Sequence, residues 1–194
     1  MTTLSAQKIV EKRILNPESK FIQLNTKNCF VVNVNSSNSP QMIVKASMEG
    51  EYQKDLVVRI EEDGQNVLVS ADFLPNFIQP NDKLSAHKVI SIALDLIIPA
   101  NTNISIHGTT SDVAVQGIYK TVEITLSDGV CRLQHQSETT KVQTQKGNII
   151  LRTNKGRITA QSIYGKVLNT EIPKGNGSYI LNSVEGDITI QKTE

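Results

Sequence analysis

Residues 104–133, ISIHGTTSDVAVQGIYKTVEITLSDGVCRL, carry the pattern that decides the fold. Two inward-type residues separated by one position recur every nine residues, and this period continues unbroken to residue 169. The pairs are Ile104/Ile106, Val113/Val115, Val122/Ile124, Cys131/Leu133, Thr140/Val142, Ile149/Leu151, Ile158/Ala160 and Val167/Asn169. After a three-residue insertion around 174–177, the period resumes with Tyr179/Leu181 and Ile188/Ile190. A fixed period of this kind is the mark of a repeat architecture.

The spacing within each pair predicts short strands. Two residues separated by one position share a face only in an extended chain, whereas a helix needs spacings of three or four. Turn residues lie between the pairs, and the glycines among them are expected to adopt positive φ angles. These glycines are Gly108, Gly117, Gly129, Gly147, Gly156, Gly165, Gly177 and Gly186. Such strands must stack to bury their apolar pairs, which predicts a β-solenoid or a tightly wound meander with coils of about 18 or 27 residues.

The chain before the repeat shows longer alternating strands. They are expected at 9–15, 21–24, 30–34, 42–46, 56–60 and 67–70, with a further alternation over 92–98. Asp63-Gly64 joins two of them and is a strong hairpin signal. We therefore predict an N-terminal β-rich region over 8–98, built as an antiparallel sheet or sandwich. It continues into a β-solenoid region over 99–192 with a shared core, and its strands are expected to cover the first coil.

Two segments interrupt this pattern. Residues 72–88 contain Pro75 and Pro80 and are interpreted as a surface excursion, with a ligand-contacting loop as the alternative. Residues 1–7 resemble the end of a secretory signal, since Leu4-Ser5-Ala6 precedes a polar Gln7. The hypothesis is a remnant of a signal peptide and an exported protein in the periplasm, on the outer-membrane surface or outside the cell. An ordinary cytoplasmic N-terminus is the alternative.

Composition excludes several classes of protein. The net charge of +1 and the aromatic content of 4% argue against nucleic-acid binding. The longest apolar run, 89–100, is too short to span a membrane and contains Asp95. Cys29 and Cys131 lie far apart in a pattern that indicates neither a zinc site nor a disulfide framework. Cys131 falls on an inward position and is expected to be buried, although a bridge to Cys29 stays open.

Several segments together resemble a known bacterial family. Ile98-Pro99-Ala100-Asn101-Thr102 is followed by Gly147-Asn148-Ile149, Gly156-Arg157-Ile158, Gly165-Lys166-Val167 and Gly186-Asp187-Ile188. This series is similar to the toast-rack putative adhesin family, a domain of unknown function with repeated Gly-Asp-Ile type units. The glycine is lost at Ser111, Lys120 and Glu138. The resemblance implies an exported β-solenoid-like protein of the bacterial envelope and transfers no catalytic residues.

No catalytic, cofactor or metal site is predicted. Calcium-binding repeats need Asp at one fixed phase, whereas Asp112, Asp128 and Asp187 occupy different phases. Glycoside hydrolysis needs two facing carboxylates, and only Glu185 and Asp187 lie close together in the repeat. The histidines are interpreted as surface imidazoles. They are His87, His107 and His135.

One polar position recurs directly after each pair and predicts a row along one side of the stack. Its members are His107, Gln116, Thr125, Gln134, Gln143, Arg152, Gln161, Thr170, Asn182 and Gln191. A basic flank is expected beside it, from Arg132, Lys141, Lys146, Arg152, Lys155, Arg157 and Lys166. The candidate ligand-contact surface comprises Gln134, Gln143, Arg152, Arg157, Gln161 and Lys166. The row either supports the corners of the coils or binds a glycan or peptide, and the flank could meet an anionic polymer or lipid headgroups.

The sequence therefore favours a non-enzymatic, exported structural or adhesion-type envelope protein whose partner is a glycan or a matrix component. Two alternatives remain: a carbohydrate-active enzyme on a β-helix, and a partner-binding scaffold or sensory domain that uses its basic face. Fold resemblance alone does not choose between them.

Overall fold

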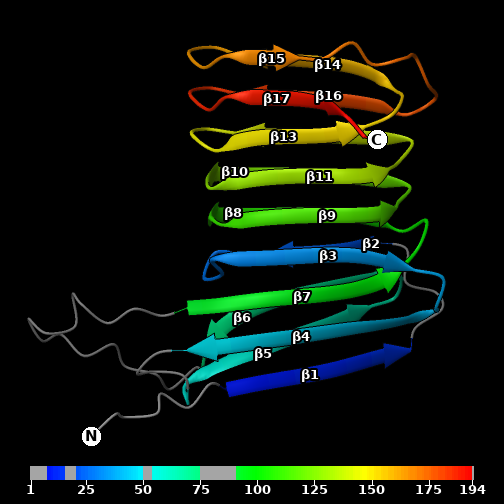
Figure 1. Cartoon of the computed structure of the whole chain (residues 1–194). Coiled ribbons are helices and arrows are strands. Elements are labelled where there is room, and N and C mark those ends of the chain that lie inside the picture. Colours follow the sequence, from blue (N-terminus) through cyan, green and yellow to red (C-terminus); the bar gives the residue numbers. More distant parts are fainter. Residues whose placement is uncertain (1–7, 16–20, 50–53, 75–90, 194) are drawn as a thin grey trace, which may run out of the picture.

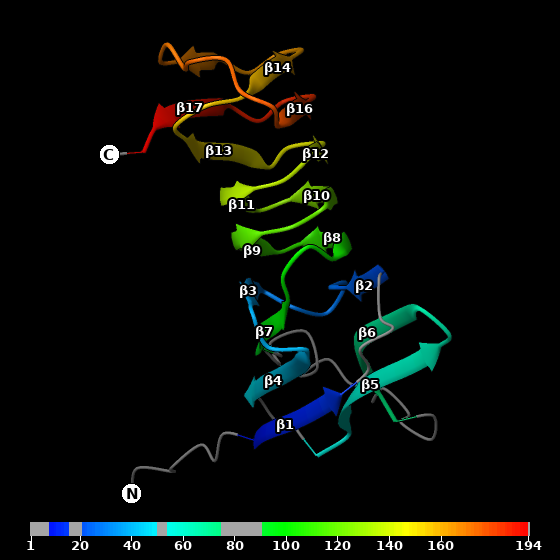
Figure 2. The ribbon, with the colours of Figure 1, turned by 90° about the vertical axis from the view of Figure 1, so that its right-hand side faces the viewer.

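The computed structural model describes residues 8–15, 21–49, 54–74 and 91–193. All regular elements in these segments are β-strands, and they form two large mixed sheets (Figure 1). The two sheets lie opposite each other along an elongated stack (Figure 2). The described residues contain no helix long and apolar enough to cross a membrane. The predicted all-β class is confirmed.

The strands are divided between a nine-stranded sheet A and an eight-stranded sheet B. In spatial order, sheet A contains β1 (Lys8–Leu15), β4 (Gln41–Glu49), β7 (Ser91–Pro99), β3 (Val31–Ser37), β9 (Asp112–Ile118), β11 (Val130–Gln136), β13 (Asn148–Thr153), β17 (Ile188–Lys192) and β15 (Val167–Asn169). Sheet B contains β14 (Arg157–Ser162), β16 (Ser178–Ser183), β12 (Thr139–Thr144), β10 (Thr121–Asp128), β8 (Asn103–Thr110), β2 (Phe21–Asn25), β6 (Asn66–Phe73) and β5 (Leu56–Asp63).

The nine-residue period corresponds to one strand, and successive strands from β8 onward alternate between the two sheets. Val122 pairs with Ile104 on one side and with Thr140 on the other, in parallel register. On the opposite sheet, Cys131 pairs with Val113 and Ile149 in the same way. Each partner is 18 residues away, so two strands make one coil. Of the two coil lengths left open by the sequence, the shorter is the correct one.

The apolar pairs face inward, between the two sheets. At most 2% of the surface is exposed for each of Ile104, Val122, Cys131 and Ile149. The residues that alternate with the inward pair on each strand point outward. Cys131 is buried as predicted. Both it and Cys29 are free thiols, and burial raises the pKa of each to about 12. The core is therefore a narrow layer of aliphatic side chains.

The last coil in sequence is not the last coil in space. Strands β16 and β17 come last in the sequence, after the coil β14–β15. In space, however, they lie between the coil β12–β13 and the coil β14–β15 (Figure 1, red between yellow and orange). Thus Tyr179 pairs with Thr140 on one side and with Ile158 on the other. The coil 157–169 is left at the end of the stack.

The quality of the inward residues explains this order. The inserted coil carries Tyr179, Leu181, Ile188 and Ile190, all buried because coils cover them on both sides. The terminal coil has the less apolar inward set Ile158, Ala160, Val167 and Asn169. Because it has a neighbouring coil on one side only, Ile158 and Ala160 are half-buried and Val167 is 40% exposed. Placing the strongly apolar coil inside the stack removes more apolar surface from water than consecutive stacking would.

The N-terminal region confirms part of the prediction and corrects part of it. Strands β5 and β6 form the expected antiparallel hairpin, with Gly64 in the left-handed region at φ 57°. Strands β1, β4 and β7 are also antiparallel. However, β2 and β3 pair in parallel with β8 and β9, so the region is not a purely antiparallel sheet. These two strands cover the first coil of the repeat, as expected.

The repeat glycines have a different role from the one predicted. Of the eight, only Gly117 and Gly129 have positive φ angles. At the others the constraint is close stacking: a Cβ at Gly147 would meet the carbonyl oxygen of Gly129, and a Cβ at Gly186 would meet that of Gly147. Glycine is required at these corners because successive coils approach too closely for a side chain.

Two of the predictions fall outside the described residues. They are the signal-peptide remnant at 1–7 and most of the surface excursion at 72–88, of which the structure describes only 72–74.

Candidate functional site

The predicted polar row is divided between the two sheets. Because one strand advances the chain by nine residues and two strands make a coil, consecutive members of the row lie on opposite outer faces. Gln134 and Arg152 belong to sheet A, whereas Gln143, Arg157 and Gln161 belong to sheet B. The prediction of one row on one side was therefore wrong, and the six candidate contact residues do not form one surface.

On sheet A the row is partly satisfied by its own members. Gln134 pairs with Gln116 in register, and Arg152 pairs with Gln191. The Arg152 Nε donates a hydrogen bond of 3.2 Å to the Gln191 side-chain oxygen. A cation paired with its neighbour along the ladder stabilises the sheet and is less available to a ligand.

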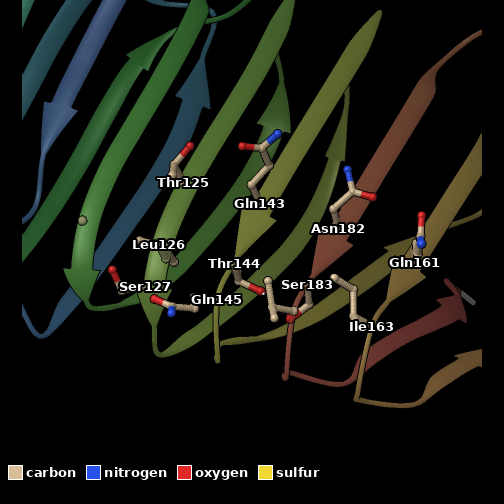
Figure 3. Close-up of a pocket in the computed structure, with 12 residues that line it drawn as sticks. Thr125, Leu126, Ser127, Gln143, Thr144, Gln145, Gln161, Ile163, Asn182 and Ser183 are labelled. Carbon is tan, nitrogen blue, oxygen red and sulfur yellow. Dashed lines mark hydrogen bonds between the residues drawn. The ribbon is translucent and has the colours of Figure 1, made fainter.

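On sheet B the row begins with His107 on β8, whose ring bonds to Ser105, and continues through four residues, Thr125, Gln143, Asn182 and Gln161, on strands β10, β12, β16 and β14 (Figure 3). Adjacent members are in register, so the polar groups follow one another at the strand spacing of about 4.8 Å. None of these four side chains hydrogen-bonds to another group in the described part of the chain. Their donors and acceptors face outward and are open to a ligand.

These side chains border a groove of about 520 Å³ on the outer face of sheet B. Leu126, Ile163 and Val184 add apolar surface to it, and no charged residue lines it. Ile163 is 61% exposed. The groove thus combines neutral amide and hydroxyl groups with exposed aliphatic surface, the composition typical of sites that bind uncharged polar molecules.

The floor of the groove is held by hydroxyl groups that face the coil corners. Thr144 Oγ1 donates to the Gly147 carbonyl oxygen at 2.6 Å and lies 2.9 Å from Ser183 Oγ. Ser183 Oγ in turn accepts the Gly186 amide N–H at 2.9 Å. These bonds fix the turns beneath the row, so the amide side chains project from a rigid surface.

Sequence reasoning found Gln143 and Gln161 but missed the apolar half of the site. It placed Thr125 and Asn182 in the row without choosing them as contacts. Selecting every second member of the row would have identified these four residues together with His107, but that requires knowing that two strands make a coil.

The expected basic flank is not continuous, and three of its members have acidic partners. Arg132 pairs with Asp112 at 3.2 Å, Lys141 with Glu123 at 3.7 Å and Lys146 with Glu185 at 3.9 Å. Arg157 donates to the Asn176 carbonyl oxygen at 3.3 Å on sheet B, whereas Lys166 directly precedes β15 of sheet A. The cations therefore lie on different faces, and the idea of one basic face is corrected.

Several carboxylates of the repeat have structural partners. Asp112 accepts the Val130 N–H at 2.9 Å, and Asp187 accepts the Lys166 N–H at 2.7 Å. Glu185, the other member of the closest acidic pair, contacts Lys146. Among the described residues there is no group of three or more His, Cys, Asp or Glu side chains that could hold a metal ion.

His135 differs from the prediction. His107 is exposed as expected, and His87 lies outside the described residues, but His135 is only 4% exposed. Its ring lies edge-on to Tyr119 and Tyr179, with centroid distances of 5.8 Å to each. Its Nε2 is 2.7 Å from Thr140 Oγ1, and its Nδ1 has no partner in the described residues. Burial lowers the His135 pKa from 6.5 to about 4.

This buried imidazole predicts a pH-dependent stability. Because the folded pKa lies below the unfolded value, the unfolded chain takes up the proton first as the pH falls. The contribution of neutral His135 to the free energy of unfolding is complete above pH 6.5. It is lost as the pH falls from 6.5 to about 4. We expect a loss of about 2 kcal/mol between pH 7 and pH 5.

Urea unfolding at a series of pH values measures this loss. His135→Gln, which cannot titrate, provides the matched comparison. It should show a shallower decline over the same window. Equal slopes for the two proteins would show that another group is responsible.

The comparisons with known proteins agree with this architecture. No protein-family model matches the chain, and no curated protein does. The chain is similar to the solved structure of a putative cell adhesion protein from Clostridium sporogenes ATCC 15579, with a TM-score of 0.66 and 16% identity over 97% of this chain and 100% of that one. At this identity the likeness shows the fold alone.

Two further solved structures align over almost the whole chain. They are putative adhesins from Bacteroides fragilis NCTC 9343 and Parabacteroides merdae ATCC 43184, each at 9% identity over 96% of this chain and 97% of theirs. Their TM-scores are 0.37 and 0.38, so they carry no argument. The likeness in fold to the Clostridium sporogenes structure agrees with the resemblance to putative adhesins that the turn motifs indicated.

Proposed function

We propose that this chain is a non-enzymatic, exported adhesion-type module of the cell envelope, and that it binds a neutral glycan through the groove on sheet B. Its 18-residue coils are taken to form a β-solenoid in which regions 8–98 and 99–192 share one core. The fold likeness to a solved structure described as a putative cell adhesion protein supports this class.

The observation that carries the ligand class is the row of unpaired polar side chains. Thr125, Gln143, Asn182 and Gln161 offer donors and acceptors at regular intervals, and the groove that they border is uncharged. A neutral polysaccharide also presents hydroxyl groups at regular intervals, together with apolar ring faces. An anionic ligand would find no cation in this groove.

A double substitution tests this ligand. We expect Gln143→Ala with Asn182→Ala to lower binding to an array of neutral oligosaccharides by about tenfold or more, because each lost hydrogen bond contributes about 1 kcal/mol. Gln116→Ala with Gln134→Ala removes the same kind of group from sheet A and should leave binding unchanged. Equal losses in both doubles, or no neutral oligosaccharide bound by the parent, would refute a site on sheet B.

The rival enzymatic function gains no support from the acidic residues, since Asp112, Asp187 and Glu185 are held by backbone or cationic partners. Export is tested by protease treatment of intact cells followed by fractionation. Full protection in the cytoplasmic fraction would overturn the envelope assignment.

A further inference from the structure

A second cleft lies where the coils turn from sheet A back to sheet B. It has a volume of about 780 Å³ and is lined by residues of four turns and by the loop that leads into β16. It shares no lining residue with the groove on sheet B. Its floor includes Tyr119 and Tyr179, both 2% exposed, whose hydroxyl groups donate to backbone carbonyls of Gln116 and His135.

The loop that forms one wall is the single insertion in the nine-residue period. The pairing of β14 with β16 places residues 21 apart side by side, instead of 18. The loop is held against the stack at both ends: the Gly156 N–H donates to the Pro173 carbonyl oxygen at 2.9 Å, and the Arg157 N–H donates to that of Gly177 at 2.8 Å. A Cβ at Gly175 would lie 3.0 Å from the Lys155 Cβ and Cγ, so this loop packs on the stem of Lys155. These contacts hold the loop against the stack and so fix this wall of the cleft.

The cleft carries an unbalanced positive charge. Lys120, Lys155 and Lys174 come from different turns and line it together, whereas Glu138 is its only carboxylate. None of the three lysines forms an ion pair within the described residues. This contrasts with Lys141 on β12 and Lys146 in the turn before β13, which each have an acidic partner. With one carboxylate for three lysines, the cleft has a net positive charge that an external anion would stabilise.

The remaining lining selects among anions. Asn101, Asn154, Asn176 and Gln136 supply amide groups, which bind hydroxyl groups well, and the cleft extends over several turns. We propose that this cleft binds an acidic polysaccharide, with its carboxylates at Lys120, Lys155 and Lys174 and its hydroxyl groups at the amides. This site would act beside the neutral groove and does not depend on it.

Titration with polygalacturonate, against its fully methyl-esterified form, tests the proposal, because esterification removes the negative charges and leaves the sugar backbone and its hydroxyl groups unchanged. We expect the parent to bind the acidic form at least tenfold more tightly. A triple variant that combines Lys120→Gln, Lys155→Gln and Lys174→Gln should lose this preference. A control triple, Lys27→Gln with Lys45→Gln and Lys54→Gln, makes the same change in net charge on exposed residues outside the cleft and should keep it.

The outcomes separate a specific site from general attraction. Equal loss in both triples, or equal binding of the two polymers by the parent, would overturn the proposal. Thermal melting of each variant shows whether it is folded. Single Lys120→Gln, Lys155→Gln and Lys174→Gln variants, each with a partial loss, replace the triple if it unfolds. Gln143→Ala with Asn182→Ala should leave the acidic preference intact, so failure of the neutral groove is distinguishable from failure of this cleft.

Discussion

Replacing Ile149 with Asp is expected to unfold the stack of coils. Ile149 is fully buried, and it pairs with Cys131 on one side and Ile188 on the other, so its side chain has apolar neighbours above and below. A carboxylate there would have to leave water without a cation or a hydrogen-bond donor to receive it. We expect a loss of more than about 4 kcal/mol in the free energy of unfolding, a large part of the stability of a typical domain. Circular dichroism and urea unfolding measure it.

The adjacent residue supplies the matched control. Ile150 lies on the outer face of the same strand and pairs with Arg132 and Thr189. Ile150→Asp introduces the same charge one position away, near a cation and in contact with water. It should change the free energy of unfolding by less than about 1 kcal/mol. If Ile149→Asp melted at the same temperature as the parent, the inward assignment of the repeat would be wrong.

The contrast between these two positions explains what the sequence could predict. Alternation with a period of two is a local property, so Ile149 and Ile150 could be assigned to opposite faces without knowing any partner. The nine-residue period likewise placed Cys131 and Thr140 on inward positions, and both are buried. The length of the coil could not be predicted from a local pattern, because it depends on which strands pair.

The order of the coils depends on a competition that no local pattern reveals. The coils 157–169 and 178–192 carry the same motif, and either could follow β13. The coil with Leu181 and Ile188 occupies the position next to β13, because an interior position buries more of its apolar surface. The coil with the polar Asn169 lies at the end of the stack, where Asn169 stays in contact with water. The same non-local pairing brings Asn182 between Gln143 and Gln161, so the candidate groove could not be assembled from the sequence.

Gly186→Ala is expected to disrupt this inserted coil. A Cβ at Gly186 would collide with the carbonyl group of Gly147, which belongs to the coil below, and with the Lys146 carbonyl oxygen. Backbone atoms cannot move aside as a flexible side chain can. The next coil is also affected, because the Gly186 carbonyl oxygen accepts the Ser162 hydroxyl at 2.8 Å. We expect a loss of about 3 kcal/mol, near the upper end for an overpacked site, which corresponds to a drop in Tm of about 10 °C.

Gly64→Ala is the comparison for this prediction, because it makes the same substitution where there is space. Nothing lies within 4 Å of the Cβ that it would add, so only its φ of 57° opposes the change. That strain costs about 1 kcal/mol. If crowding between coils explains the repeat glycines, Gly186→Ala must be the more destabilising of the two in thermal unfolding. The reverse order would mean that the glycines are needed for backbone conformation, as the sequence alone suggested, and that the coils can separate to admit a methyl group.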